Sequence, residues 1–236
     1  MAHPNFLLTS RTFIVGDSSG IGFSVASGAL SNGSKSLYPD AHVNGSAADL
    51  SNTETLEIHL LSVLDAAVKE TGEAPDHIGH TAGDPGIFGG NWRKQPRRRG
   101  SSPSPCAISA PSNPGKYLNP AASSSIILMS GLLAYRPRPG SSPMIGPAGA
   151  VEVLTRALAV DLTPIRVNVV ILGQVDTEFF HGLFGGNTEV LSKIKAANLT
   201  KQIGTPEGAA EAYLFCMRSV LATGQGFKID NGNLMV

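Results

Sequence analysis

A short apolar strand that leads through a glycine-rich turn into a helix constrains the fold of this chain more than any other feature. Residues 12–15 (TFIV) are β-branched or aromatic, which favours a buried strand, and the turn at 16–22 reads GDSSGIG. Apolar residues then recur at helical spacing until Asn32-Gly33, which predicts the end of a helix. Glycines at such a turn let backbone N–H groups approach a diphosphate at the positive end of the helix. The segment therefore predicts a nucleotide-binding unit.

The same alternation of strand and helix continues along the 236 residues of the chain. Strand-like segments lie at 41–50, 76–83, 123–131, 165–173 and 226–232, and helical patterns lie at 55–71, 149–162 and 206–219. Strands that alternate with helices indicate a parallel sheet covered on both faces. We therefore predict an α/β fold, a single Rossmann-type, doubly wound parallel sheet, with one domain over 1–236.

Two stretches interrupt this alternation. Residues 34–40 are too few to supply both a second strand and a useful crossover helix, so the second β-α unit is expected to be short. Residues 88–115 are rich in Pro, Arg and Ser, and their five prolines exclude a long helix. We therefore expect an irregular insertion there, in place of the fourth helix.

Composition narrows the classes of partner. The net charge is zero and 15% of residues are charged, which gives no general attraction to nucleic acid or to anionic membranes. No apolar run reaches the ~18 residues that a membrane helix needs.

Cys106 and Cys216 form no spacing pattern, so we expect reduced thiols in a cytoplasmic protein and no metal site. The basic cluster at 92–99 (WRKQPRRR) is interpreted as a solvated loop. The alternative is that it binds the backbone of a nucleic acid.

Taken together, these segments resemble the short-chain dehydrogenase/reductase family, in the style of its fungal natural-product members. The resemblance covers most of the chain except roughly 34–40 and 88–115, and its motifs occur in the family's order. It implies a Rossmann fold that transfers a hydride from NADPH or NADH to a small-molecule substrate. Many members are dimers or tetramers, so a homo-oligomer is one expectation.

The resemblance also implies which residues hold the cofactor. Asp49 matches the family residue at the adenine ring, although it could instead cap the following helix. Thr177 can bind a carboxamide or phosphate oxygen, and it can also cap a helix. His80 is interpreted as a polar group at a strand end rather than as a base. The full set is Gly16, Ser18, Ser19, Ile21, Gly22, Asp49, His80, Ala82, Gly83, Val175 and Thr177.

The choice between NADP and NAD depends on residues soon after the glycine turn. Lys35 and Ser36 favour the 2′-phosphate of NADP, whereas an acid such as Asp40 would bind the ribose diol of NAD. Asp40 lies in a stretch that looks like a turn into a strand. NADP is therefore the expected cofactor, with NAD as the alternative.

The catalytic positions depart from the family pattern. Members use a Tyr that transfers the proton, a Lys four residues later that lowers its pKa, and a Ser on the preceding strand. Ser130 matches the Ser, but Met144 and Ala148 occupy the Tyr and Lys positions and neither can transfer a proton. Tyr135 is the nearest phenol, yet it has no Lys four residues later and is a weaker candidate. Arg166 and Asn168 are interpreted as structural.

Three functions remain open. The first is an NAD(P)H-dependent oxidoreductase of fungal secondary metabolism, such as alkaloid biosynthesis, that reduces an activated C=N or C=O bond without the Tyr–Lys pair. Some fungal relatives that lack both residues reduce iminium ions, whose positive charge removes the need for a proton donor. The second is a non-catalytic remnant of the family, and the third is a nucleic-acid-binding module built on the basic loop. Titration with NADPH separates the first from the other two.

Overall fold

The computed structural model describes residues 10–16, 20–31, 56–82, 117–139, 141–184 and 187–236. Three sequence predictions fall elsewhere: the short second β-α unit at 34–40, the strand at 41–50 and the irregular insertion at 88–115. They lie outside the described residues. Within the described part, no helix is both long and apolar enough to cross a membrane.

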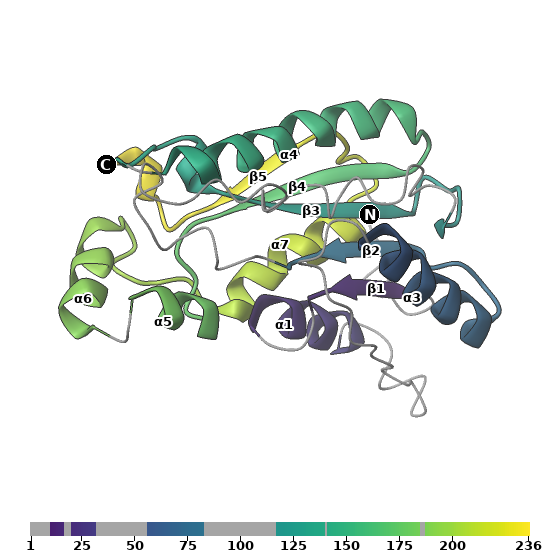
Figure 1. Ribbon diagram of the computed structural model, residues 1–236, viewed down its shortest axis with the longest axis horizontal. Helices are drawn as coiled ribbons and strands as arrows, with labels where there is room; N and C mark the ends of the chain where they lie inside the picture. Colours follow the sequence, from purple (N-terminus) through teal and green to yellow (C-terminus); the bar gives the residue numbers. More distant parts are fainter. Residues whose placement is uncertain (1–9, 17–19, 32–55, 83–116, 140, 185–186) are drawn as a thin grey trace.

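A five-stranded parallel sheet forms the centre of the described structure (Figure 1). Its strands lie side by side in chain order, and the central pair matches seven residues, from Ser125 beside Arg166 to Gly131 beside Leu172. Because every pair is parallel, the carboxyl ends of all strands meet at one edge of the sheet. The strands are β1 (Thr12–Val15), β2 (His77–His80), β3 (Ser125–Gly131), β4 (Arg166–Leu172) and β5 (Gly226–Ile229).

Helices cover both faces of this sheet (Figure 1). Side chains alternate along a strand, so Ile127 of β3 packs with α1 and α7 on one face while Ile126 and Leu128 pack with α4 on the other. The predicted doubly wound α/β architecture is therefore confirmed. The helices are α1 (Gly20–Ala29), α3 (Leu56–Thr71), α4 (Ser142–Asp161), α5 (Glu178–Phe184), α6 (Thr188–Ala197) and α7 (Pro206–Arg218), with short 3-10 helices η5 (Leu132–Ala134) and η6 (Asn233–Met235).

Two predicted boundaries shift. Helix α4 begins at Ser142, about two turns before the predicted start of its regular part, and it contains Pro147. The last strand ends at Ile229, because the following Asp230 accepts backbone hydrogen bonds from Gly232 and Leu234 and so closes a turn. Neither shift changes the order of the predicted elements, but α5 and α6, between β4 and α7, were not predicted.

Buried Arg166, at the start of β4, ties the sheet to the end of α7. Its guanidinium donates five hydrogen bonds of 2.5–2.9 Å to backbone carbonyl oxygens. Three of these oxygens belong to the last turn of α7 and the residue after it, where helix carbonyls have no partner within the helix. The side-chain amide of Asn168 donates to the carbonyl oxygen of Ala222 and accepts from the backbone nitrogen of Gln225. The structural roles predicted for Arg166 and Asn168 are confirmed. The acceptors of Arg166 are Ala122, Ser123, Cys216, Met217 and Ser219.

Candidate functional site

Gly16 and Gly22, at the two ends of the glycine turn after β1, lie where a side chain would not fit. Gly16 has a φ of +93°, in the left-handed region that favours glycine. A Cβ atom added to Gly16 would lie 2.8 Å from the backbone nitrogen of Ala82, and one added to Gly22 would lie 2.0 Å from the carbonyl oxygen of Gly16. Gly16 and Gly22 therefore let the end of β1 and the first turn of α1 approach each other closely, and we call Gly16, Gly20 and Gly22 the glycine cradle.

Thr81, directly after β2, fixes the shape of the glycine cradle. Its hydroxyl lies 3.0 Å from the carbonyl oxygens of both Val15 and Gly16 and can donate to either, and its backbone nitrogen donates to Val15 over 2.9 Å. Sequence reasoning named the neighbours His80 and Ala82 and missed Thr81. The available signal was a hydroxyl residue at the strand end next to the glycine turn.

His80 is a buried, neutral side chain. Burial lowers the pKa of its imidazole to about 4, and neither ring nitrogen has a hydrogen-bond partner among the described residues. Its backbone carbonyl accepts a 3.1 Å hydrogen bond from the hydroxyl of Tyr213. His80 therefore supports the end of β2, in agreement with its interpretation as a structural polar group.

Thr177 lies beside the glycine cradle, at the start of α5. Its hydroxyl oxygen accepts a 3.1 Å hydrogen bond from the backbone nitrogen of Phe180, so the predicted helix-capping role is present. Its methyl carbon would lie 3.3 Å from a Cβ atom on Gly20, which places the loop after β4 against the start of α1. Val175, two residues earlier, is buried and pairs with Gly204 in a parallel bridge.

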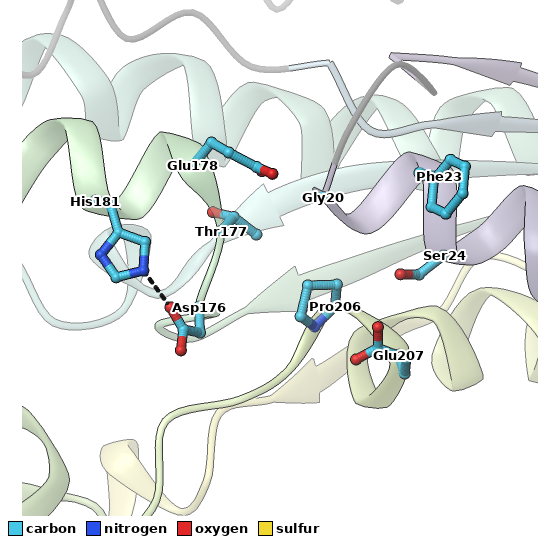
Figure 2. Close-up of a pocket in the computed structure, with 9 residues that line it drawn as sticks. All are labelled: Gly20, Phe23, Ser24, Asp176, Thr177, Glu178, His181, Pro206 and Glu207. Carbon is cyan, nitrogen blue, oxygen red and sulfur yellow. Dashed lines mark ion pairs between the residues drawn. The ribbon is translucent and has the colours of Figure 1, made fainter.

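A cavity of about 330 Å³ opens between α1, α5 and α7 (Figure 2). Three of its lining residues are acidic, and Asp176 forms a 2.6 Å ion pair with His181. A carboxylate oxygen of Glu178 would lie 3.6 Å from a Cβ atom on Gly20, next to the positive end of α1. The negative charge of Glu178 therefore repels an anion bound at the glycine cradle. The lining residues are Gly20, Phe23, Ser24, Asp176, Thr177, Glu178, His181, Pro206 and Glu207.

Ser130, at the carboxyl end of β3, belongs to a hydrogen-bonded group that includes a carboxylate. Its hydroxyl lies 3.2 Å from the backbone carbonyl of Ala148 and 3.2 Å from a carboxylate oxygen of Glu152. Tyr135 donates a short hydrogen bond to the other oxygen of Glu152, and the ammonium of Lys228 lies 4.3 Å from the centroid of the Tyr135 ring. We call Ser130, Tyr135 and Glu152 the Ser130 cluster.

The Ser130 cluster differs in chemistry from the family's Ser–Tyr–Lys set. The hydrogen bond to Glu152 raises the pKa of Tyr135 to about 12, the opposite of what the family's Lys does to its Tyr. Tyr135 therefore remains a phenol and is a poor proton donor. Glu152 was missed by sequence reasoning, although it follows Ala148 by one helical turn and so shares its face of α4.

The described structure brings together one part of the expected site. Gly16, Ile21, Gly22, His80, Ala82, Ser130, Ala148, Val175 and Thr177 all lie at or near the carboxyl edge of the sheet. Met144 lies in the first turns of α4, but its side chain is outside the described part. The same holds for the whole of Ser18, Ser19, Asp49 and Gly83. Among the described residues, no group of three or more His, Cys, Asp or Glu side chains could hold a metal ion.

Comparisons with known proteins agree with this arrangement. Residues 103–236 match a family described as an SDR-like Rossmann domain. The short-chain dehydrogenase/reductase ATR9 of Stachybotrys chlorohalonatus is 33% identical over 89% of this chain and 91% of its own. The short-chain dehydrogenase/reductase malC of Malbranchea aurantiaca is 31% identical over 98% of this chain and 97% of its own.

Solved structures extend the likeness to the fold. The reductase/Diels–Alderase MalC from Malbranchea aurantiaca superposes with a TM-score of 0.85, at 29% identity and 99% coverage of both chains. A small-chain dehydrogenase in complex with NADPH superposes with a TM-score of 0.72 over 96% of this chain and all of its own, at 23% identity. At this low identity, the similarity to the NADPH complex shows a shared fold and nothing further.

Proposed function

Because the chain belongs to the short-chain dehydrogenase/reductase family, we propose that it is an NADPH-dependent oxidoreductase that reduces an activated C=N or C=O bond. The observation that carries this proposal is the glycine cradle, where a Cβ atom on Gly22 would lie 2.0 Å from the oxygen of Gly16. Glycines at the start of a helix suit a diphosphate, because they let it approach backbone N–H donors closely.

The residues around the cradle fit a dinucleotide of the NADP type. Gly16, Gly20 and Gly22 would hold the diphosphate, Thr81 keeps the turn in place, and Thr177 would face the nicotinamide end. When bound, the cofactor supplies the hydride for reduction. The NADPH complex of a structural neighbour and the expected role of Lys35 and Ser36 support NADP, and NAD is the alternative.

The substrate is a small molecule that needs little help with a proton. Ala148 carries no titratable group, and the phenol of Tyr135 is held as a donor to Glu152. A C=N or C=O bond that is already polarised by its own charge or substituents meets this condition, because positioning then supplies most of the rate. The fungal relatives support a place in secondary metabolism. Alkaloid biosynthesis, a cytoplasmic location and a homo-oligomer are further parts of this proposal.

One observation favours a second candidate, the non-catalytic remnant. The carboxylate of Glu178 lies where it repels a bound diphosphate, as expected of a site that no longer selects for its cofactor. Fluorescence titration of the purified full chain with NADPH and NADH tests the two. Micromolar binding supports the reductase, and folded protein without binding supports the remnant. Salt-sensitive binding of RNA would instead favour the basic loop at 92–99 as a nucleic-acid-binding module.

A further inference from the structure

We infer that Asn233, in the C-terminal 3-10 helix η6, is a positioning residue for the nicotinamide end of the cofactor. It acts through Asn198 and the segment that follows α6, which is hydrogen-bonded to the loop that carries Val175 and leads to Thr177. This role rests on the proposed function, because a nicotinamide end is present only if the cofactor binds.

The loop after β4 is paired with Gly204 directly before Thr177. The backbone nitrogen of Gly204 donates to the carbonyl oxygen of Gln174 over 3.0 Å, and its own carbonyl oxygen accepts from the nitrogen of Asp176 over 2.8 Å. Val175 lies between these two contacts and forms the parallel bridge with Gly204. The position of the loop beyond the end of the sheet therefore depends on where Gly204 is held.

Asn198 holds the segment that leads from α6 to Gly204. None of the side chains of α6 is buried, whereas Asn198, directly after the helix, is fully buried. Its side-chain amide donates to the carbonyl oxygen of Gln202 over 2.6 Å, and its side-chain oxygen accepts from the side-chain amide of Asn233 over 2.9 Å. A carbonyl can only accept, so the contact with Gln202 fixes which end of the Asn198 amide faces Asn233.

Asn233 is in turn fixed to the body of the fold. Its backbone carbonyl oxygen accepts a 2.9 Å hydrogen bond from the guanidinium of Arg136. The next residue, Leu234, packs against the apolar core that β3, β4 and α4 share, and its nitrogen donates to the carboxylate of Asp230 over 2.9 Å. Figure 1 shows α6 and the C-terminus at the same end of the sheet. Asn233 therefore provides a firm support for Asn198.

Loss of the Asn233 side chain would leave the buried oxygen of Asn198 without its donor, which is costly enough to shift the segment. Gly204 would move with it, and so would the loop that carries Val175. The glycine cradle belongs to β1 and α1 instead, so the diphosphate should still be held. The effect should therefore be confined to the nicotinamide end, as the loss of about three- to tenfold in affinity that one hydrogen bond supplies.

The test compares NADPH with ADP-ribose 2′-phosphate, which retains the diphosphate and both riboses but lacks the nicotinamide. In calorimetric titrations of the full-length protein, Asn233→Ala should raise the dissociation constant of NADPH about three- to tenfold and leave that of ADP-ribose 2′-phosphate unchanged. A merely structural role for Asn233 would weaken both ligands alike. Met235→Ala, at an exposed position in the same 3-10 helix, is the control and should change neither constant.

Asn198→Ala removes the same hydrogen bond from its other end and tests the role independently if Asn233→Ala does not fold. It should also weaken NADPH selectively, and adding Asn233→Ala to it should cause no further loss, because both changes break one contact. Equal losses for the two ligands, or unchanged NADPH affinity in both single variants, would overturn the role of Asn233 and leave the proposed function intact. Wild-type protein that binds neither ligand would overturn the proposed function itself.

Discussion

A Cβ atom on Gly22 would lie 2.0 Å from the carbonyl oxygen of Gly16, so the turn between β1 and α1 closes only because position 22 is glycine. Real Cβ atoms do not approach so closely, and the obstacle is backbone that has no side chain to swing aside. This close approach packs the first turn of α1 against the end of β1. The proposed cofactor site depends on this relationship more than on any single side chain.

Gly22→Ala tests that relationship. The added methyl group must push the turn open, so we expect NADPH affinity to fall at least tenfold and the protein to lose stability. Gly146→Ala, in α4, is the matched control, because nothing lies within 4 Å of its added Cβ atom and alanine favours a helix. NADPH titration and thermal unfolding of both variants measure the two effects. Unchanged NADPH binding in Gly22→Ala would show that the glycine cradle does not hold the cofactor.

Glu178→Gln tests the charge beside the cradle. Removing a negative charge near the diphosphate should tighten NADPH binding by several-fold, because such a repulsion at a partly solvated site is worth on the order of 1 kcal/mol. Glu189→Gln, a carboxylate on α6 that pairs with Lys193, is the control and should change nothing. The gain should also shrink at high salt. Weaker binding in Glu178→Gln would mean that this carboxylate contacts the cofactor favourably.

Arg166→Met tests the connection between the sheet and α7. The variant leaves five buried or part-buried carbonyl oxygens without their donor, and loss of such a network costs about 3 kcal/mol or more of unfolding free energy. Arg156→Met, an exposed position on α4, should stay within about 0.5 kcal/mol. Urea unfolding measures both. A stable Arg166→Met variant would show that water replaces the guanidinium.

Two buried histidines predict how stability depends on pH. Burial lowers the pKa of His77 and of His80 from 6.5 to about 4, so between these values the unfolded chain binds more protons than the folded one. The unfolding free energy should therefore fall as the pH drops from about 6.5 to 4. His80→Asn should flatten this slope. Urea titrations at several pH values give the slopes, and an equal slope in His80→Asn would contradict the buried neutral imidazole.

The sequence predicted the parts of the structure that are local. The order of the strands and of the helices other than α5 and α6 follows from hydrophobic spacing, and the glycine turn follows from its residues and its place after a strand. Thr81 and Glu152 were missed because their roles arise only when separate elements meet: Thr81 reaches back to β1, and Glu152 reaches across to Ser130. The start of α4 was placed late because Gly146, Pro147 and Gly149 do not favour a helix by themselves, and packing against β3 and β4 overrides their propensity.

Calorimetric titration of the full-length protein with NADPH is the most direct test of the central claim, that backbone amides around the glycine cradle hold the diphosphate of a nicotinamide cofactor. We expect one site per chain with micromolar affinity, and loss of the heat signal in Gly22→Ala. A preparation that unfolds cooperatively yet gives no heat with either NADPH or NADH would contradict it.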